Sequence, residues 1–128
     1  MFKMDGKDMY LNRGDNIIIK LTNKKSNFKV GDYITFSIVK ENDYTTLYFQ
    51  KRYDITEESE TFSIVLEPDD TRFIDLFKTG SKTFWYEIEL NGAETLIGYD
   101  TDGGKKFVLY PEAPKKEINI EPEPMESI

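Results

Sequence analysis

Alternation of apolar and polar side chains is the feature that most constrains the fold of this chain. It is clearest in three segments, YITFSIVK (33–40), TFSIVLE (61–67) and TFWYEIEL (83–90). Side chains two residues apart lie on the same face of a strand, so each segment predicts a strand with one buried face. The residues expected to point inward are Ile34, Phe36, Ile38, Phe62, Ile64, Leu66, Phe84, Tyr86, Ile88 and Leu90.

Further short apolar segments recur between turn residues. They are NIIIKLT (16–22), TTLYFQKRY (45–53), ETLIGY (94–99) and KFVLY (106–110). In the first, Ile17, Ile19 and Leu21 are in phase, and in the second Leu47 and Phe49 are in phase. Short strands at this spacing are typical of an antiparallel β-sandwich, here of about seven to eight strands. The sequence therefore predicts an all-β fold.

One segment departs from the alternation. PDDTRFIDLFKTG (68–80) begins with residues that favour a helix start, and Phe73, Ile74 and Phe77 follow at helical spacing. Gly80 stands where a left-handed cap would end the helix. This pattern predicts one short helix over about residues 69–78, whose aromatic side chains close one end of the core.

From Pro111 the composition changes to PEAPKKEINIEPEPMESI, which is rich in Glu and Pro. Proline interrupts both helices and central strands, so we expect a β-sandwich domain over residues 1–110 and a C-terminal tail over residues 111–128. Within the tail, Ile118 and Ile120 alternate with polar residues. This short stretch, EINIE, is predicted to add as a strand to the edge of a partner's sheet.

The composition narrows the chemistry open to the protein. It has no cysteine and no histidine, which excludes thiolate nucleophiles, histidine-based triads and most zinc or iron sites. With 24 acidic and 17 basic residues, the net charge of −7 opposes binding to nucleic acid. The longest apolar run, 107–110, is too short to cross a membrane. We expect a cofactor-free protein made in a cytoplasm, with no nucleic-acid or membrane partner.

Two motifs resemble functional sites. Asp100 and Asp102 open like an EF-hand calcium loop, but the later ligand positions do not match, so a hairpin turn with Asp102-Gly103 at its tip is favoured. Arg13-Gly14-Asp15 spells an integrin-binding tripeptide. Since Gly-Asp before a strand is ordinary turn chemistry, and Gly31-Asp32 repeats it, a structural turn is the better interpretation.

Several apolar residues fall out of phase with the predicted core. They are Val39, Tyr48, Val65, Trp85, Ile97, Tyr99, Val108 and Tyr110. Aromatic residues collected on one sheet would mark a binding surface, whereas the same residues facing a second sheet or the tail would belong to the core. Both interpretations stay open. The candidate interface residues are Trp85, Tyr99, Tyr110, Ile118 and Ile120.

The order of segments resembles a known family. YLNRGD, FKVGDYITFSIVK, LEPDDTRFIDL, TFWYEIEL and IGYDTDGGKKFVLYPEA follow one another as in the N-terminal domain of phage baseplate upper proteins and related small tail proteins from phages and prophages of Gram-positive bacteria. The resemblance covers roughly residues 9–113. It implies an immunoglobulin-like β-sandwich that attaches other parts to a baseplate, without an active site.

These observations lead to one main functional expectation and one alternative. We expect a non-enzymatic structural module of a phage tail or phage-derived contractile particle, present in multiple copies and bound to other tail or baseplate proteins. The alternative is a carbohydrate-binding module in which exposed aromatic side chains, Trp85 among them, stack on sugars.

Overall fold

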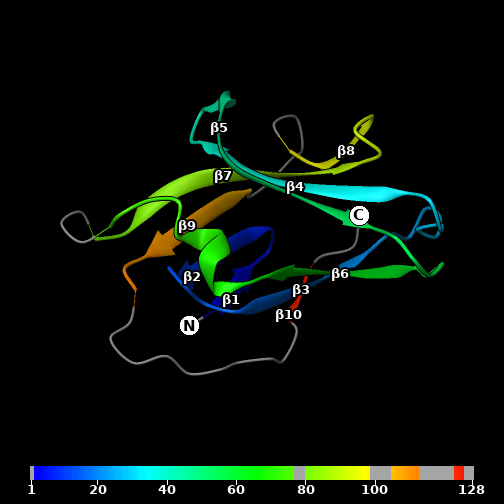
Figure 1. The fold of residues 1–128 in the computed structure, drawn as a ribbon, viewed down its shortest axis with the longest axis horizontal. Coiled ribbons are helices and arrows are strands. Elements are labelled where there is room, and N and C mark those ends of the chain that lie inside the picture. Colours follow the sequence, from blue (N-terminus) through cyan, green and yellow to red (C-terminus); the bar gives the residue numbers. More distant parts are fainter. Residues whose placement is uncertain (1, 77–79, 99–104, 113–122, 126–128) are drawn as a thin grey trace.

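The computed structural model describes residues 2–76, 80–98, 105–112 and 123–125. Most of these residues lie in strands, which form one mixed sheet of seven strands and a second sheet of three (Figure 1). No helix in this part of the chain is long and apolar enough to cross a membrane. The all-β prediction is confirmed at this level.

The larger sheet has one continuous path of strands and one side branch. Its order is β1 (Phe2–Asp5), β2 (Asp8–Asn12), β9 (Lys106–Tyr110), β7 (Lys82–Leu90), β4 (Tyr33–Lys40) and β5 (Asp43–Asp54), and β8 (Glu94–Ile97) pairs with β7. The smaller sheet has the order β10 (Glu123–Pro124), β3 (Ile17–Thr22) and β6 (Thr61–Leu66). Two pairings, β2 with β9 and β10 with β3, are parallel, whereas the sequence analysis expected only antiparallel pairs.

Both sheets contribute to one hydrophobic core. In Figure 1 the strands β4, β5 and β7 lie above β3, β6 and β10. The buried residues are Met9, Leu11, Ile17, Ile19, Leu21, Phe28, Ile34, Phe36, Ile38, Ile55, Ile64, Leu66, Leu76, Phe84, Tyr86, Ile88, Ile97, Phe107, Leu109 and Met125. Burial of this many large apolar side chains supplies the main driving force for folding.

The alternation correctly predicts the inward faces of β3, β4 and β7. Phe62 and Leu90 are only partly buried, but both pack against the core. In β5 the predicted phase holds for Phe49, which packs against the core, but is wrong for Leu47, which is 53% exposed, while Tyr48 packs inward. The reason is a β-bulge, because Ile38 pairs with Phe49 and the next residue of β4 pairs with Leu47, which leaves Tyr48 as the extra residue.

A second irregularity decides between the two interpretations for Ile97. This residue fell out of phase with the predicted core, and it is fully buried. The register of β7 with β8 shifts between Ile88 and Glu89, so that Ile97 lies opposite Ile88 while Thr95 lies opposite Glu89. The shift turns Ile97 to the same inward face as Ile88.

The segment predicted as a helix over 69–78 forms only a short 3₁₀ helix, η1 (Pro68–Thr71). Its start is capped, because the Asp70 carboxylate accepts a hydrogen bond from the Glu67 amide at 2.8 Å. Beyond it, the Ile74 carbonyl accepts a bond from the Arg13 side chain at 2.7 Å instead of serving a helical turn. Residues 77–79 lie outside the described part of the chain.

The aromatic part of that prediction is confirmed for one residue. Phe73 stacks on Tyr48 and Phe49 with ring centroids 6.0 and 6.3 Å apart, and meets the edge of Phe84 at 5.3 Å. These contacts place Phe73 against the core without a full helix to carry it. Aromatic pairs of this geometry add modestly to the free energy of burial.

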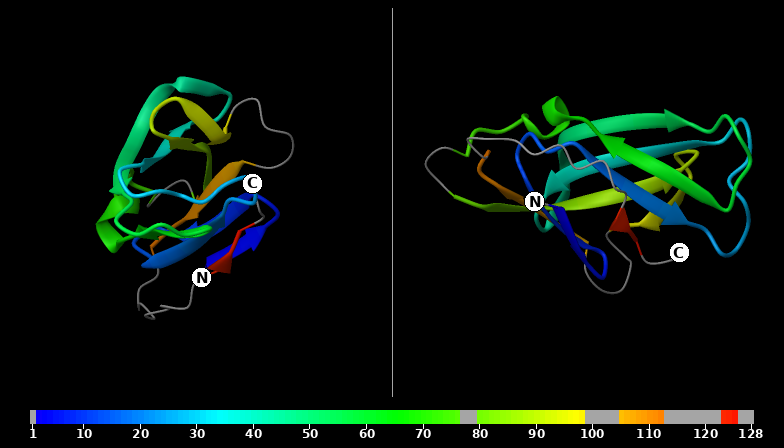
Figure 2. Two further views of the ribbon diagram at one scale, coloured as in Figure 1. Left: turned by 90° about the vertical axis from the view of Figure 1, so that its right-hand side faces the viewer. Right: turned by 90° about the horizontal axis from the view of Figure 1, so that it is seen from below.

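Part of the expected tail returns to the body of the protein. Glu123 pairs with Ile19, Pro124 pairs with Lys20, and Met125 is only 6% exposed and belongs to the core. Figure 2 shows this short red strand between the blue strands β3 and β1. The segment EINIE, which was predicted to pair with a partner's sheet, lies outside the described residues.

Candidate functional site

The outer face of the larger sheet carries an apolar row that crosses three strands. Leu47 of β5 pairs with Val39 of β4, and Val39 pairs with Trp85 of β7. The neighbouring residues Ile38 and Phe84 point into the core, so these three side chains lie on the opposite face. We call Leu47, Val39 and Trp85 the outer row.

Exposure differs among the three side chains of the outer row and is greatest on the end strand β5. Val39 is 3% exposed, Trp85 is half-buried, and Leu47 is 53% exposed. The Lys105 ammonium lies 4.5 Å from the centroid of the Trp85 ring, in cation–π contact with its face. Tyr44, also on β5, is 52% exposed. Two of the exposed large apolar side chains in the described part of the chain therefore lie on β5, where the larger sheet ends, and the third, Val30, is 67% exposed in the turn before β4.

A carboxylate lies close to the outer row. Glu87 is half-buried on β7, and burial together with the nearby Glu89 carboxylate raises its pKa, while Lys105 lowers it. A carboxylate that loses solvent favours its neutral form. The cross-strand neighbours of Glu87 are polar. Ser37 of β4 pairs with Glu87 on one side and with Gln50 of β5 on the other, and the Gln50 side-chain amide donates to the Ser37 hydroxyl at 3.0 Å.

Tyr110, the second predicted interface residue that the structure describes, lies on the same outer face at the end of β9. Its neighbour Leu109 is fully buried, and Tyr110 itself is half-buried and pairs with Asn12 of β2. Trp85 pairs with Lys106, four residues before Tyr110 on β9. The two predicted residues therefore share a face but lie at different positions along it.

The chain that follows Tyr110 is firmly bound. The Arg13 amide donates to the Tyr110 carbonyl at 2.8 Å, and the Asn12 side chain donates to the Pro111 carbonyl at 2.8 Å. The Glu112 carboxylate accepts from Arg13 at 2.9 Å and from two nitrogens of Arg72 at 3.1 and 3.4 Å. We call these contacts the 110–112 clamp.

The Arg13-Gly14-Asp15 motif forms part of this structure rather than a displayed loop. The buried Gly14 amide donates to the Thr71 hydroxyl at 2.6 Å, and the Asp15 carboxylate accepts from the Asn12 amide at 2.8 Å. Because Arg13 binds Glu112 and a backbone carbonyl, the tripeptide takes part in contacts within the fold. The structural interpretation of this motif is confirmed.

Gly31-Asp32 repeats the same turn, as predicted. In both turns the Asp carboxylate accepts from the amide three residues earlier, and the Asp amide donates back to that residue's carbonyl. Both glycines have positive φ, 82° for Gly14 and 96° for Gly31, which other residues adopt at a cost. The Asn91 side chain also binds Asp32 and lowers the pKa of its carboxyl, with the Lys29 amide adding to the effect.

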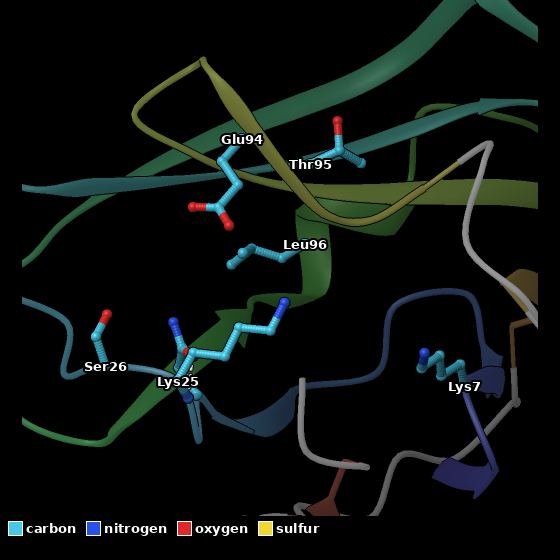
Figure 3. A pocket seen from close by; sticks show the side chains of 7 residues that line it. Lys7, Lys25, Ser26, Glu94, Thr95 and Leu96 are labelled. Carbon is cyan, nitrogen blue, oxygen red and sulfur yellow. Dashed lines mark hydrogen bonds between the residues drawn. The ribbon is translucent and has the colours of Figure 1, made fainter.

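A polar pocket of about 250 Å³ lies at the other end of the larger sheet from the clamp. It is lined by Lys7, Asn23, Lys25, Ser26, Glu94, Thr95 and Leu96. In Figure 3, Leu96 and the Glu94 carboxylate project toward Lys25, whereas Thr95 points away. Mixed charge and an open shape favour neither an anion nor a cation, and the chain has no histidine or cysteine to provide a base or thiolate there.

Two tyrosines illustrate how the fold uses its buried polar groups. The Tyr53 hydroxyl donates to the Val65 carbonyl at 2.5 Å, and the Tyr86 hydroxyl donates to the Lys7 carbonyl at 2.5 Å. Burial raises the pKa of Tyr53 far above its usual range, with Asp70 and Glu67 adding to the effect, so the phenol stays a neutral donor.

Within the described ranges, no buried side-chain polar atom lacks a partner and no three acidic side chains form a metal-binding cluster.

The remaining predicted site residues are not placed. Tyr99, Ile118 and Ile120 of the interface set, and Asp102 and Gly103 of the predicted turn, lie outside the described residues. The sequence analysis missed the β3–β10 pairing and the exposure of Tyr44 and Leu47. The only signal for the β3–β10 pairing was one apolar residue, Met125. The exposed residues of β5 depend on a bulge that alternation does not reveal.

We compared the chain with known protein families, with curated proteins and with solved structures. None of them matches it.

Proposed function

We propose that this protein is a non-enzymatic structural and assembly module that docks on neighbouring protein subunits. The observation that carries the proposal is the outer row, which leads across the larger sheet to Leu47, a leucine with 53% of its surface exposed on the end strand β5. Tyr44, on the same strand, is also exposed. Apolar and aromatic side chains at an accessible sheet edge are typical of protein interfaces.

The proposed setting is a phage tail or phage-derived contractile particle, with other tail or baseplate proteins as partners and many copies in the assembly. The resemblance of the segment order to baseplate upper proteins supports this setting. In the same proposal, the two sheets and their shared core constitute an immunoglobulin-like sandwich whose larger sheet includes parallel pairs.

The internal contacts suit a module that bears load. The ion pairs of Glu112 with Arg13 and Arg72 connect the turn after β2, the segment after η1 and the end of β9. The Tyr53 hydroxyl connects β5 to β6. A stable interface requires about 800 Å² from each partner. Leu47 would supply an apolar centre for such an area, and the polar residues beside it would form its rim.

The carbohydrate-binding alternative is less well supported. Sugar stacking needs an open aromatic face, and the Lys105 ammonium lies over the Trp85 ring at 4.5 Å. Trp85 is also half-buried beside the nearly inaccessible Val39. These contacts favour a role for Trp85 in supporting the outer row over a role in contacting a glycan.

Leu47→Lys tests the docking surface. The substitution adds one charge to an exposed apolar position, so we expect the folded protein to persist while its incorporation into particles, measured by quantitative immunoblotting of purified particles, falls at least tenfold. Thr56→Lys is the matched control, because it adds the same charge at an exposed loop position. Equal incorporation of both variants would contradict the proposal.

A further inference from the structure

The turn between β7 and β8 contains a chemically reactive pair of residues, Asn91-Gly92. The Ala93 amide donates to the Leu90 carbonyl at 3.1 Å, and both central residues have positive φ, 56° for Asn91 and 64° for Gly92. Positive φ at both positions is the property of type I′ turns, in which Asn-Gly is a favoured pair. Residues 91–93 are all exposed, so water reaches the turn.

The glycine makes Asn91 prone to lose ammonia. Glycine has no side chain to hinder attack by its own backbone nitrogen on the preceding asparagine, and Asn91 is the one asparagine in the sequence that glycine follows. A Cβ at position 92 would lie 3.0 Å from the Tyr33 hydroxyl oxygen, and the positive φ there also disfavours other residues. The fold thus requires the glycine that makes Asn91 reactive.

The Asn91 side chain is bound through both of its polar atoms. Its Oδ1 accepts from the Tyr33 amide at 2.9 Å, and its Nδ2 donates to the Asp32 carboxylate at 3.0 Å. The Asn91 backbone amide also donates to the Tyr33 carbonyl at 2.9 Å. Loss of ammonia requires the side-chain carbon Cγ to reach the Gly92 nitrogen, so contacts that hold the side chain against Asp32 and Tyr33 oppose the reaction.

We propose that Asn91 is a deamidation site whose rate is set by its hydrogen bond to Asp32. When this contact opens, the Gly92 backbone nitrogen attacks Cγ of Asn91. The new C–N bond closes a succinimide ring, the bond from Cγ to Nδ2 breaks, and ammonia leaves with the proton of the Gly92 amide. Water then opens the ring at one of its two carbonyl carbons and leaves aspartate or isoaspartate at position 91.

The reaction alters the contact that controls it. The product has a carboxylate in place of the Nδ2 donor, beside the Asp32 carboxylate. The Asn91 hydrogen bond is the main cause that lowers the pKa of Asp32, so deamidation removes the donor that stabilises the Asp32 charge. Both carboxylates are ionised at neutral pH, and like charges this close repel. Deamidation should therefore loosen the contact between the β7–β8 turn and the start of β4.

Two variants of Asp32 test how the rate is controlled. Asp32→Ala removes the acceptor of the Asn91 donor, whereas Asp32→Asn removes the charge and retains an acceptor oxygen. The full-length folded proteins are incubated in mildly alkaline buffer, and peptide mass spectrometry follows the mass gain of deamidation at Asn91. We expect Asp32→Ala to react about tenfold faster than the parent, as loss of a hydrogen bond to a charged group implies, and Asp32→Asn no more than about threefold faster.

Asn42 provides a control within the same samples. It also has positive φ, 62°, and is exposed in the turn before β5, but Asp43 follows it instead of glycine. In the urea-unfolded chain we expect Asn91 to react at least tenfold faster than Asn42. Similar rates for the two in urea would overturn the site itself.

Three results in the folded protein would overturn control by the hydrogen bond. They are an unchanged Asn91 rate in Asp32→Ala, equal rates in Asp32→Ala and Asp32→Asn, and an acceleration that Asn42 shares with Asn91. The last result would show a general loosening of the protein rather than release of one contact. The inference concerns the chain itself, so it does not depend on the proposed assembly role.

Discussion

The strands β3 of the smaller sheet and β5 of the larger sheet differ in how they are paired. On the smaller sheet, β3 is the middle strand, and its side away from β6 is paired over two residues with β10, with Met125 in the core beside it. On the larger sheet, β5 ends the strand order with Leu47 and Tyr44 more than half exposed. Unpaired edges invite association with another chain, so a covered edge contributes to folding while an open edge is available for binding. Substitutions at the two edges should therefore affect different properties.

The largest contrast is expected between Ile19→Ala and Leu47→Ala. Ile19 is fully buried in β3, and removing its side chain should lower the free energy of unfolding by about 3 kcal/mol. Leu47 is exposed, so its replacement should change that free energy by less than about 0.5 kcal/mol. Urea denaturation of both variants measures the difference. Similar losses for the two would contradict the distinction between the edges.

Met125→Ala sharpens the comparison at the covered edge. The side chain is buried, but it belongs to a strand of two residues, so the loss should be about 2 kcal/mol, at the low end for a buried methionine. Because β10 forms only two residue pairs with β3, hydrogen exchange at the Met125 amide should accelerate more than exchange in β4. Uniform acceleration in both strands would show that β10 is not separable.

Tyr53→Phe tests where the open edge of β5 begins. This residue ties β5 to β6 through the Val65 carbonyl, and loss of its hydroxyl should cost about 1 kcal/mol. Since the folded protein raises the pKa of Tyr53, the stability that depends on its neutral form is complete below pH 10 and is lost as the pH rises above it. Tyr53→Phe should therefore remove part of the alkaline destabilisation, measured by thermal unfolding between pH 8 and about 11. An unchanged alkaline profile would contradict this role.

The smallest effect is expected for Glu87→Gln beside the outer row. Burial raises the pKa of Glu87, so its charged form is penalised once the pH rises above the unfolded value near 4.5. Glutamine removes that penalty, and the variant should be more stable than the parent at pH 7 by up to about 0.5 kcal/mol, a small figure because the residue is half-exposed. At pH 4 the two proteins should be equally stable, and a stabilisation that persists there would require a different cause.

Much of the strand content was predictable from the sequence, because alternation reports directly on which face of a strand is buried. The inward faces of β3, β4 and β7, and the turn at Gly14-Asp15, follow from two-residue spacing and turn chemistry. Bulges are invisible to this reasoning, since one extra residue at Tyr48 or one register shift beside Ile88 reverses the face of everything beyond it. Such shifts misplaced Leu47 and put Tyr48 and Ile97 out of phase with the predicted core.

Long-range partners explain the other differences. The helical spacing of Phe73 and Ile74 was real, but the Ile74 carbonyl binds Arg13, sixty-one residues away. The parallel pairing of β10 with β3 depends on a meeting of distant segments that local pattern does not encode. For the candidate site, the sequence identified Trp85 and Tyr110 as outward residues, while the exposed part of the row became visible only from the burial of each side chain.

The parallel pair β2–β9 also bears on how the protein is made. Met9 pairs with Phe107, so the first half of this pair waits for 98 further residues before its partner exists. At about 5 to 20 residues per second, translation takes roughly 5 to 20 seconds to deliver that partner. During this interval the early strands are exposed to neighbouring nascent chains. The order of synthesis, rather than the strength of any contact, then sets when the core can close.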